Sequence, residues 1–189
     1  MLVDSTPSLR GIMLGFVAEL QLVKRFLSIS KDISYSQKPD DHNRGEKGDR
    51  QIIYKGESFV VESKSIQTNS IKKVRGADGA EYWTAKAQVD ASDCRTVTFP
   101  DGSSAATTCL RTGGFDLLAV NCFAFEGKWN FVFGKNADLP RTSYKKYTAH
   151  QQENLLATLV PVTWPPKPPF ADDPYPLLEE LLAERKGEE

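Results

Sequence analysis

The sequence has few residues of the kinds that build zinc sites, disulfide frameworks or membrane spans. Its three cysteines, Cys94, Cys109 and Cys122, stand far apart and in odd number, which favours free thiols in a reducing cytosol. With no CxxC pair and two histidines, His42 and His150, a zinc site is not expected. No apolar run approaches the ~18 residues of a membrane span. The N-terminal stretch also lacks a basic-then-apolar leader, so we expect a cytoplasmic protein without membrane contact.

The chain also lacks a P-loop, a glycine-rich cofactor loop, and helicase or methyltransferase motifs, which excludes the common nucleotide-dependent classes. Its length of 189 residues predicts one compact domain. The net charge is −1, yet residues 172–189 hold seven acidic residues against two basic ones, so the remainder is basic. This bias is compatible with a phosphate-binding face, and a mixed solvated surface explains it equally well.

The order of the expected elements favours an α/β domain around a mixed sheet. Thr6-Pro7 starts a helix over 7–28, with apolar residues at three- and four-residue spacing. A strand starts near 33–35, a hairpin follows over 49–54 and 58–65, and residues 82–133 are β-rich. We expect a helix over 143–160, a proline-dense extended arm without regular structure over 161–176, and a terminal helix over 177–186. The apolar stripe of the first helix comprises Leu9, Ile12, Met13, Phe16, Leu20, Val23 and Leu27.

The predicted hairpin places two carboxylates and an ammonium together. In the strand 58–65, side chains alternate, so Glu62 and Lys64 share one face. Asp49 begins the preceding strand, and the hairpin brings it near that face. Two carboxylates at a sheet edge suit Mg²⁺, which takes one or two carboxylates together with phosphate and water. Such a metal activates water for phosphodiester hydrolysis, and Lys64 can orient that water or neutralise charge on the phosphate.

The candidate motif consists of Asp49, a gap of twelve residues, and then Glu62-Ser63-Lys64 on an apolar strand. This motif resembles that of the PD-(D/E)xK nucleases, with Gly48 in the place where the family name has proline. The resemblance spans about residues 7–70. It implies a restriction endonuclease-like mixed sheet flanked by helices, Mg²⁺ as cofactor with Mn²⁺ as a substitute, and DNA as substrate. The family often acts as a dimer, so a homodimer is an expected partner. Residues 1–160 would form the nuclease domain, with 82–133 as a β-rich extension, and 161–189 an arm with a short helix.

Further residues join the candidate site. Glu19 lies inside the apolar stripe, where a carboxylate is costly unless it is paired or metal-bound. Many family members carry an acid on the first helix facing the active site, so the resemblance assigns Glu19 a supporting role as metal ligand or in orienting Lys64. Gln67 matches a glutamine that some branches carry after the strand. The expected phosphate contacts are Arg44, Lys47, Arg50, Lys72, Lys73 and Arg75.

Structural alternatives stay open for these features. Glu62 and Lys64 also fit an ordinary cross-strand ion pair, and Lys72, Lys73 and Arg75 a solvated loop. Asp116 fits best as a strand-start residue hydrogen-bonded to the loop at Gly113-Gly114, and the aromatic residues of 83–133 as core. We expect a Mg²⁺-dependent endonuclease acting on DNA, of restriction or defence type. The alternatives are a repair nuclease or junction resolvase and, in another class, a non-catalytic DNA-binding or interaction protein on the same fold.

Overall fold

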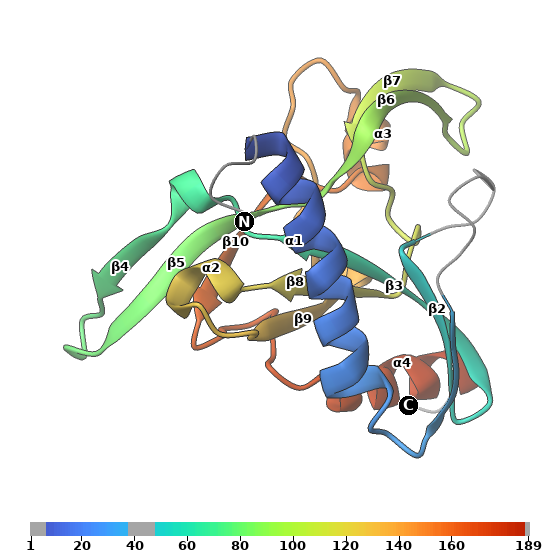
Figure 1. Ribbon diagram of the computed structural model, residues 1–189. Coiled ribbons are helices and arrows are strands. Elements are labelled where there is room, and N and C mark those ends of the chain that lie inside the picture. The colour runs from blue at the N-terminus through green and yellow to red at the C-terminus, as the bar shows by residue number, and fades with distance from the viewer. Residues whose placement is uncertain (1–6, 38–47, 188–189) are drawn as a thin grey trace.

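A five-stranded mixed sheet forms the centre of the computed structural model, which describes residues 7–37 and 48–187 (Figure 1). The strand order is β1-β2-β3-β8-β9. β3 runs parallel to β8, and the other neighbours are antiparallel. The strands are β1 (Ile33–Gln37), β2 (Arg50–Tyr54), β3 (Glu57–Ser65), β8 (Leu117–Asn121) and β9 (Phe131–Lys135). The expected α/β architecture around a mixed sheet is confirmed, as is the hairpin β2–β3.

A second sheet and a separate ribbon account for much of the β-rich region. The second sheet has three antiparallel strands in the order β10-β5-β4. The ribbon consists of β6 and β7 and lies at the upper right, beside α3, in the view of Figure 1. These strands are β4 (Lys72–Arg75), β5 (Glu81–Gln88), β6 (Asp90–Thr98), β7 (Ser104–Cys109) and β10 (Leu159–Trp164).

The helices differ from expectation mainly in the C-terminal third. The first helix is α1 (Pro7–Leu22), continued by a π-helical turn (Val23–Leu27), and together they match the predicted helix 7–28. The predicted helix 143–160 is wrong, because α3 spans Ala149–Asn154 alone and the chain then extends into β10. α2 (Phe123–Glu126) follows β8, and α4 (Pro174–Lys186) ends the described chain. Within the described ranges, no helix is long and apolar enough to cross a membrane.

The central sheet is covered on its two faces by different elements. On one face, Leu117 packs with Leu22 of α1 and Leu178 of α4. On the other face, Leu118 packs with Val160 of β10 and with the second sheet. The sheet therefore lies between a helical layer and a second β-layer, and each side chain of β3 points toward one or the other.

The apolar stripe that we expected to face the core points outward over most of α1. Ile12 is 58% exposed and Leu20 66%, whereas Ala18 and Leu22 are each 2% exposed. The exposed large apolar residues of α1 are Leu9, Ile12, Met13, Leu14, Phe16, Val17 and Leu20. Val23 and Leu27 pack against the core, whereas the earlier members of the stripe are exposed, because α1 turns Ala18 and Leu22 toward the sheet.

The proline-dense segment is more regular than expected. Pro161–Trp164 belong to β10, where Pro161 pairs with Lys86 of β5, so the expectation of no regular structure over 161–176 is wrong there. β10 is an edge strand, and a residue without an N–H is tolerated on the side that has no partner strand. Phe170 is 7% exposed and packs into the core between the sheets. α4 begins at Pro174 rather than at 177, after Asp173 accepts a hydrogen bond from the Tyr175 N–H.

Candidate active site

Glu62 and Lys64 meet on the face of β3 that looks toward the second sheet. In the parallel register, Glu62 lies beside Leu118 and Lys64 beside Val120, whose side chains belong to the core between the two sheets. The Lys64 Nζ lies 2.7 Å from the Glu62 Oε1. Glu62 is 7% exposed, and the Lys64 side chain is 20% exposed. The pair is therefore largely withdrawn from water, unlike an ordinary surface ion pair.

Asp49 is held against β3 by the backbone. Its N–H donates to the Val61 carbonyl at 3.1 Å, and its Oδ2 accepts a hydrogen bond from the Ser63 N–H at 2.8 Å. The Asp49 charge acts on both Glu62 and Lys64. The structure thus brings together the three residues that the motif predicts, with Asp49 attached to the strand that carries the other two by one bond from its backbone N–H and one to its carboxylate.

The pKa values in this cluster follow from burial and charge. Burial is the largest cause that raises the pKa of Glu62, and the neighbouring Asp49 charge raises it further, while Lys64 and Arg95 act in the opposite direction. Burial by itself would lower the pKa of Lys64, but the charges of Glu62 and Asp49 outweigh it, so that pKa lies above its ordinary value. Lys64 therefore stays an ammonium at neutral pH, and Glu62 holds a proton more readily than an exposed glutamate.

The structure gives a physical reason for Gly48 in the place of the family's proline. Gly48 has φ +73°, which proline cannot adopt and other L-residues adopt at a cost. A Cβ at this position would lie 2.2 Å from the Val60 Cγ1 and 3.2 Å from the Val61 carbonyl oxygen. Glycine is therefore the residue that lets the chain approach β3 closely enough for Asp49 to make its two bonds.

Glu19 does not join the carboxylates of Asp49 and Glu62. It is half-buried on α1, which packs on the opposite face of the central sheet, and its charge acts on Arg50. In the parts of the chain that the structure describes, no group of three or more acidic, histidine or cysteine side chains is placed to hold a metal. The supporting role expected for Glu19, as metal ligand or in orienting Lys64, stays a prediction.

Arg50 also lies on the helical face, because it pairs with Val61 in the hairpin register. Its Nη1 donates to the Ser36 hydroxyl at 3.2 Å, and burial lowers the pKa of its guanidinium despite the Glu19 charge. The structure thus gives Arg50 intramolecular partners, and the phosphate contact expected of it stays a prediction. Arg44 and Lys47 lie outside the described residues.

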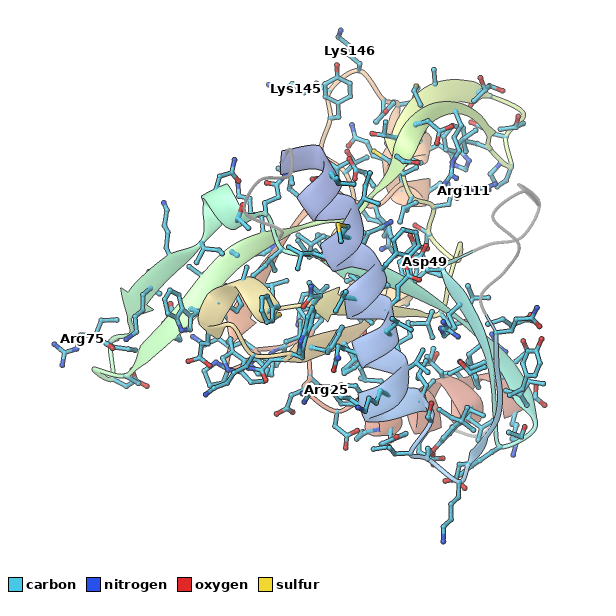
Figure 2. The ribbon with its side chains drawn as sticks, viewed as in Figure 1. Arg25, Asp49, Arg75, Arg111, Lys145 and Lys146 are labelled. Carbon is cyan, nitrogen blue, oxygen red and sulfur yellow. The ribbon has the colours of Figure 1, made fainter. Side chains whose placement is uncertain are left out.

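The basic residues after β3 lie away from the cluster. Lys72, Lys73 and Arg75 are exposed on the edge strand β4, and Figure 2 shows Arg75 at the far end of the second sheet from Asp49. The Lys73 Nζ pairs with Glu81 at 2.5 Å. The structure therefore does not bring these three residues into the site. Lys72–Arg75 form a strand rather than the solvated loop that was the structural alternative.

Gln67 follows β3 without contact to the cluster that the structure records. Its N–H donates to the Lys86 carbonyl at 2.8 Å, and its Nε2 donates to the Gln88 side chain at 3.2 Å. Together with the Ile66–Ala87 bridge, these bonds attach the end of β3 to β5. A catalytic role for Gln67 stays a prediction, while its structural role is to join the two sheets.

Sequence reasoning missed two charged neighbours of the site, Asp90 and Arg95. Both belong to β6, which begins just after the segment of β5 that joins the end of β3. The Arg95 charge lowers the pKa of Glu62, and the Asp90 charge raises that of Lys64. No local pattern could have found them, because they reach the site through a contact between segments about 30 residues apart in the sequence.

Asp116 has a structural role other than the one expected. Its Oδ2 accepts a hydrogen bond from the Val60 N–H at 2.7 Å, and its Oδ1 accepts one from the Arg185 Nη2, also at 2.7 Å. The expected bond to the loop at Gly113-Gly114 is wrong. Asp116 instead joins β3 to the C-terminal helix α4 and so supports the strand that carries Glu62 and Lys64.

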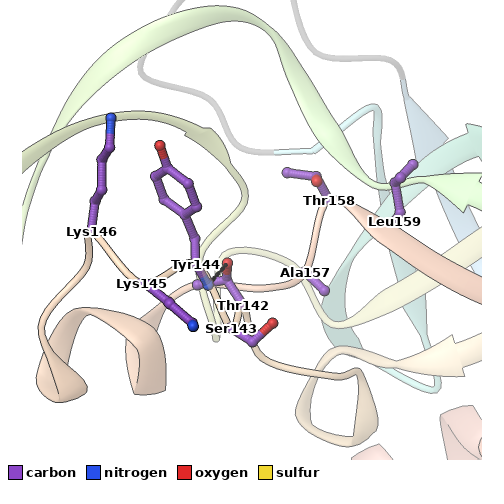
Figure 3. Close-up of a pocket in the computed structure, with 8 residues that line it drawn as sticks. All are labelled: Thr142, Ser143, Tyr144, Lys145, Lys146, Ala157, Thr158 and Leu159. Atoms are coloured by element: carbon purple, nitrogen blue, oxygen red, sulfur yellow. Dashed lines mark hydrogen bonds between the residues drawn. The ribbon is translucent and has the colours of Figure 1, made fainter.

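A surface hollow of about 570 Å³ lies elsewhere, between the loop 142–146 and the start of β10 (Figure 3). Its walls include Tyr144, Lys145, Lys146 and Thr158, and none of the three motif residues lines it. The hollow therefore contributes nothing to the candidate active site.

Comparison with known proteins adds little to this geometry. No family model and no curated protein matches the chain. Among solved structures, the chain is similar to a bacterial homing endonuclease, I-Ssp6803I, at 15% identity and a TM-score of 0.36, over 80% of this chain and 89% of that chain. A likeness of this extent supports no conclusion about activity.

Proposed function

We propose that this chain is a Mg²⁺-dependent endonuclease that hydrolyses DNA phosphodiester bonds, with Asp49, Glu62 and Lys64 as its catalytic residues. The observation that carries the proposal is the withdrawal of these three side chains into one cluster on β3. Taking charged groups out of water is costly even when they are paired, and a carboxylate whose pKa is raised by burial beside a second carboxylate is typical of functional sites. Within this function we propose a restriction or defence role.

The donor set suits a hard divalent cation. Asp49 and Glu62 supply carboxylate oxygens, and like charge between them raises the pKa of Glu62. Mg²⁺ is commonly bound by one or two protein carboxylates, with phosphate and water completing its shell, and Mn²⁺ accepts similar ligands. When bound, the ion would lower the pKa of a bound water and stabilise negative charge on the phosphate. Asp49 and Glu62 are the residues that would hold it.

The protein's own groups orient the Asp49 carboxylate and supply the positive charge of Lys64. The backbone N–H of Ser63 and the Asp49 N–H fix the Asp49 carboxylate to β3, so its direction is set before substrate arrives. Lys64 is kept protonated by the two carboxylates, and therefore acts as a hydrogen-bond donor and positive charge rather than as a general base. A donor in a site that excludes water stabilises charge developing on phosphate more strongly than it would in bulk solvent.

A nicking experiment tests the proposal directly. Supercoiled plasmid is incubated with the protein in Mg²⁺, in Mn²⁺ and in EDTA, and a four-way junction is offered as a second substrate. We expect plasmid cleavage with either cation, none in EDTA, and no preference for the junction. The matched control removes the exposed Lys73–Glu81 pair by Lys73→Ala, which should leave cleavage unchanged. Absence of cleavage of both substrates with a folded protein would contradict the proposal and favour a non-catalytic DNA-binding protein.

The raised pKa of Glu62 predicts an acid limb in the activity profile that depends on metal concentration. Because cation binding needs the carboxylate, activity should rise as pH increases through a value above the ordinary glutamate pKa of 4.5. Protons and cations compete for Glu62, so a higher Mg²⁺ concentration should move this limb to lower pH. The profile is measured at two Mg²⁺ concentrations; a limb that does not move would remove Glu62 from the proposed ligands.

A further inference from the structure

The outer face of α1 is apolar and exposed over most of its length. We define this face by Ile12, Met13, Val17 and Leu20, which are exposed to 58%, 43%, 38% and 66%. In the view of Figure 1, α1 runs from top to bottom across the front of the central sheet. Contiguous apolar surface of this kind is uncommon on monomeric proteins and marks a site of association.

Packing within one chain does not bury these apolar side chains. On the side of α1 turned toward the sheet, Ala18 and Leu22 are each 2% exposed. A Cβ at Gly15 would meet nothing within 4 Å, so one turn earlier the helix no longer packs closely against its own chain. The large apolar side chains before Leu22 are exposed. A helix that is apolar all round is typically buried by other protein surface on all sides. The exposed face of α1 is therefore expected to bind another molecule.

The composition of α1 favours a second copy of the same chain as that partner. Its 16 residues include two ionisable side chains, Arg10 and Glu19, in the sequence PSLRGIMLGFVAELQL. A helix that binds a membrane surface carries a strongly charged polar face, which this helix lacks. Interfaces between different, separately stable proteins are about as polar as the rest of the surface, whereas homodimer interfaces are more apolar.

The spacing of the face is also suited to pairing with a like helix. Met13, Val17 and Leu20 follow one another at four and three residues, the alternation with which side chains of one helix fit between those of another. An uncharged apolar face is complementary to itself, as an isologous two-fold interface requires. The same face on both copies would therefore be buried at once.

We propose that the chain is a homodimer in which the outer face of α1 packs against the same face of a second copy. This places the dimer contact on α1. The proposal is independent of the nuclease function, because it follows from the surface of α1 and involves neither metal nor the residues Asp49, Glu62 and Lys64.

The mass of the full chain in solution, measured by light scattering after size exclusion without metal or DNA, tests the proposal. We expect twice the 21.0 kDa of one chain for the unaltered protein and a single-chain mass for the double variant Met13→Glu/Leu20→Glu. The control is Leu159→Glu, which places the same charge on an apolar residue of β10 that is 40% exposed. This control should remain a dimer.

Each outcome of the experiment decides the proposal. A single-chain mass for the unaltered protein at all concentrations up to about a hundred micromolar would overturn it, as would a double variant that remains dimeric. Both altered side chains are exposed in the single chain, so the double variant should keep its circular dichroism spectrum. Should it unfold, Met13→Cys in a Cys94→Ser background provides a second measurement: oxidation should then link two chains through position 13, and failure to link would contradict the proposal.

Discussion

Replacing Lys64 with alanine is expected to lower the rate of DNA cleavage by roughly 10²–10³-fold, the usual loss when one preorganised contact to a transition state is removed. DNA affinity should change little, because phosphate binding is shared by many basic groups. The measurement pairs single-turnover plasmid cleavage with a binding assay in Ca²⁺, on protein whose folding is checked by circular dichroism. Cleavage at the parent rate would mean that Glu62 and Lys64 form a structural ion pair.

The neighbouring pair on the second sheet provides the comparison for this variant. Lys73 and Glu81 lie 2.5 Å apart, as close as Lys64 and Glu62, but their side chains are 50% and 58% exposed. Lys73→Ala should therefore leave both rate and stability nearly unchanged, since exposed pairs contribute little. Lys64→Ala should also lower stability, because it leaves Glu62 buried without its counter-charge. Comparing the two variants separates loss of catalysis from loss of fold.

The sequence was sufficient to predict the hairpin and its charged residues, because both depend on local rules. Two-residue alternation placed Glu62 and Lys64 on one face of β3, and the short turn at 55–56 brought β2 back beside it. Asp49 then had to lie near that face. These inferences need no knowledge of distant segments, and in the structure Lys64 pairs with Glu62 while the Asp49 charge acts on both.

The position of Glu19 could not be predicted in the same way. Periodicity indicates that α1 is a helix with an apolar stripe, but it does not say which of two apolar sides meets the sheet. In the structure, Ala18 and Leu22 face inward, and α1, which carries Glu19, packs on the face of the sheet opposite Glu62. A helix apolar on both sides is ambiguous to a pattern that assumes one buried face.

Long-range pairing explains the other differences. Pro161 was taken to end regular structure, yet it occupies an edge strand, and which strand of a sheet is an edge is set by the whole chain. Asp90 and Arg95 reach the site because the Ile66–Ala87 bridge joins the end of β3 to β5. Features of this kind depend on which segments meet in space, and a single sequence records that only weakly.

Gly48→Ala is expected to destabilise the fold and to displace Asp49. The left-handed φ of +73° costs alanine about 1–2 kcal/mol. The new Cβ would also lie 2.2 Å from the Val60 Cγ1, and overpacking of this sort costs roughly 1–3 kcal/mol. We expect a loss of about 2–5 kcal/mol in the free energy of unfolding, the sum of these two effects, measured by urea denaturation. Activity should fall with it, since the bond from the Ser63 N–H to Asp49 depends on this close approach.

A double-mutant cycle with Val60→Ala separates the two causes. Removing the Val60 Cγ1 should relieve the clash, so Gly48→Ala should cost less in the Val60→Ala background, with a coupling energy of about 1–3 kcal/mol. Gly127→Ala is the control: Gly127 has φ +70°, but a Cβ there meets nothing within 4 Å, so the variant should show the conformational cost alone, about 1–2 kcal/mol. Gly48→Ala could instead cost no more stability than Gly127→Ala and show no coupling to Val60. In that case the left-handed backbone before Asp49, and not close packing against β3, would be the reason for glycine at this position.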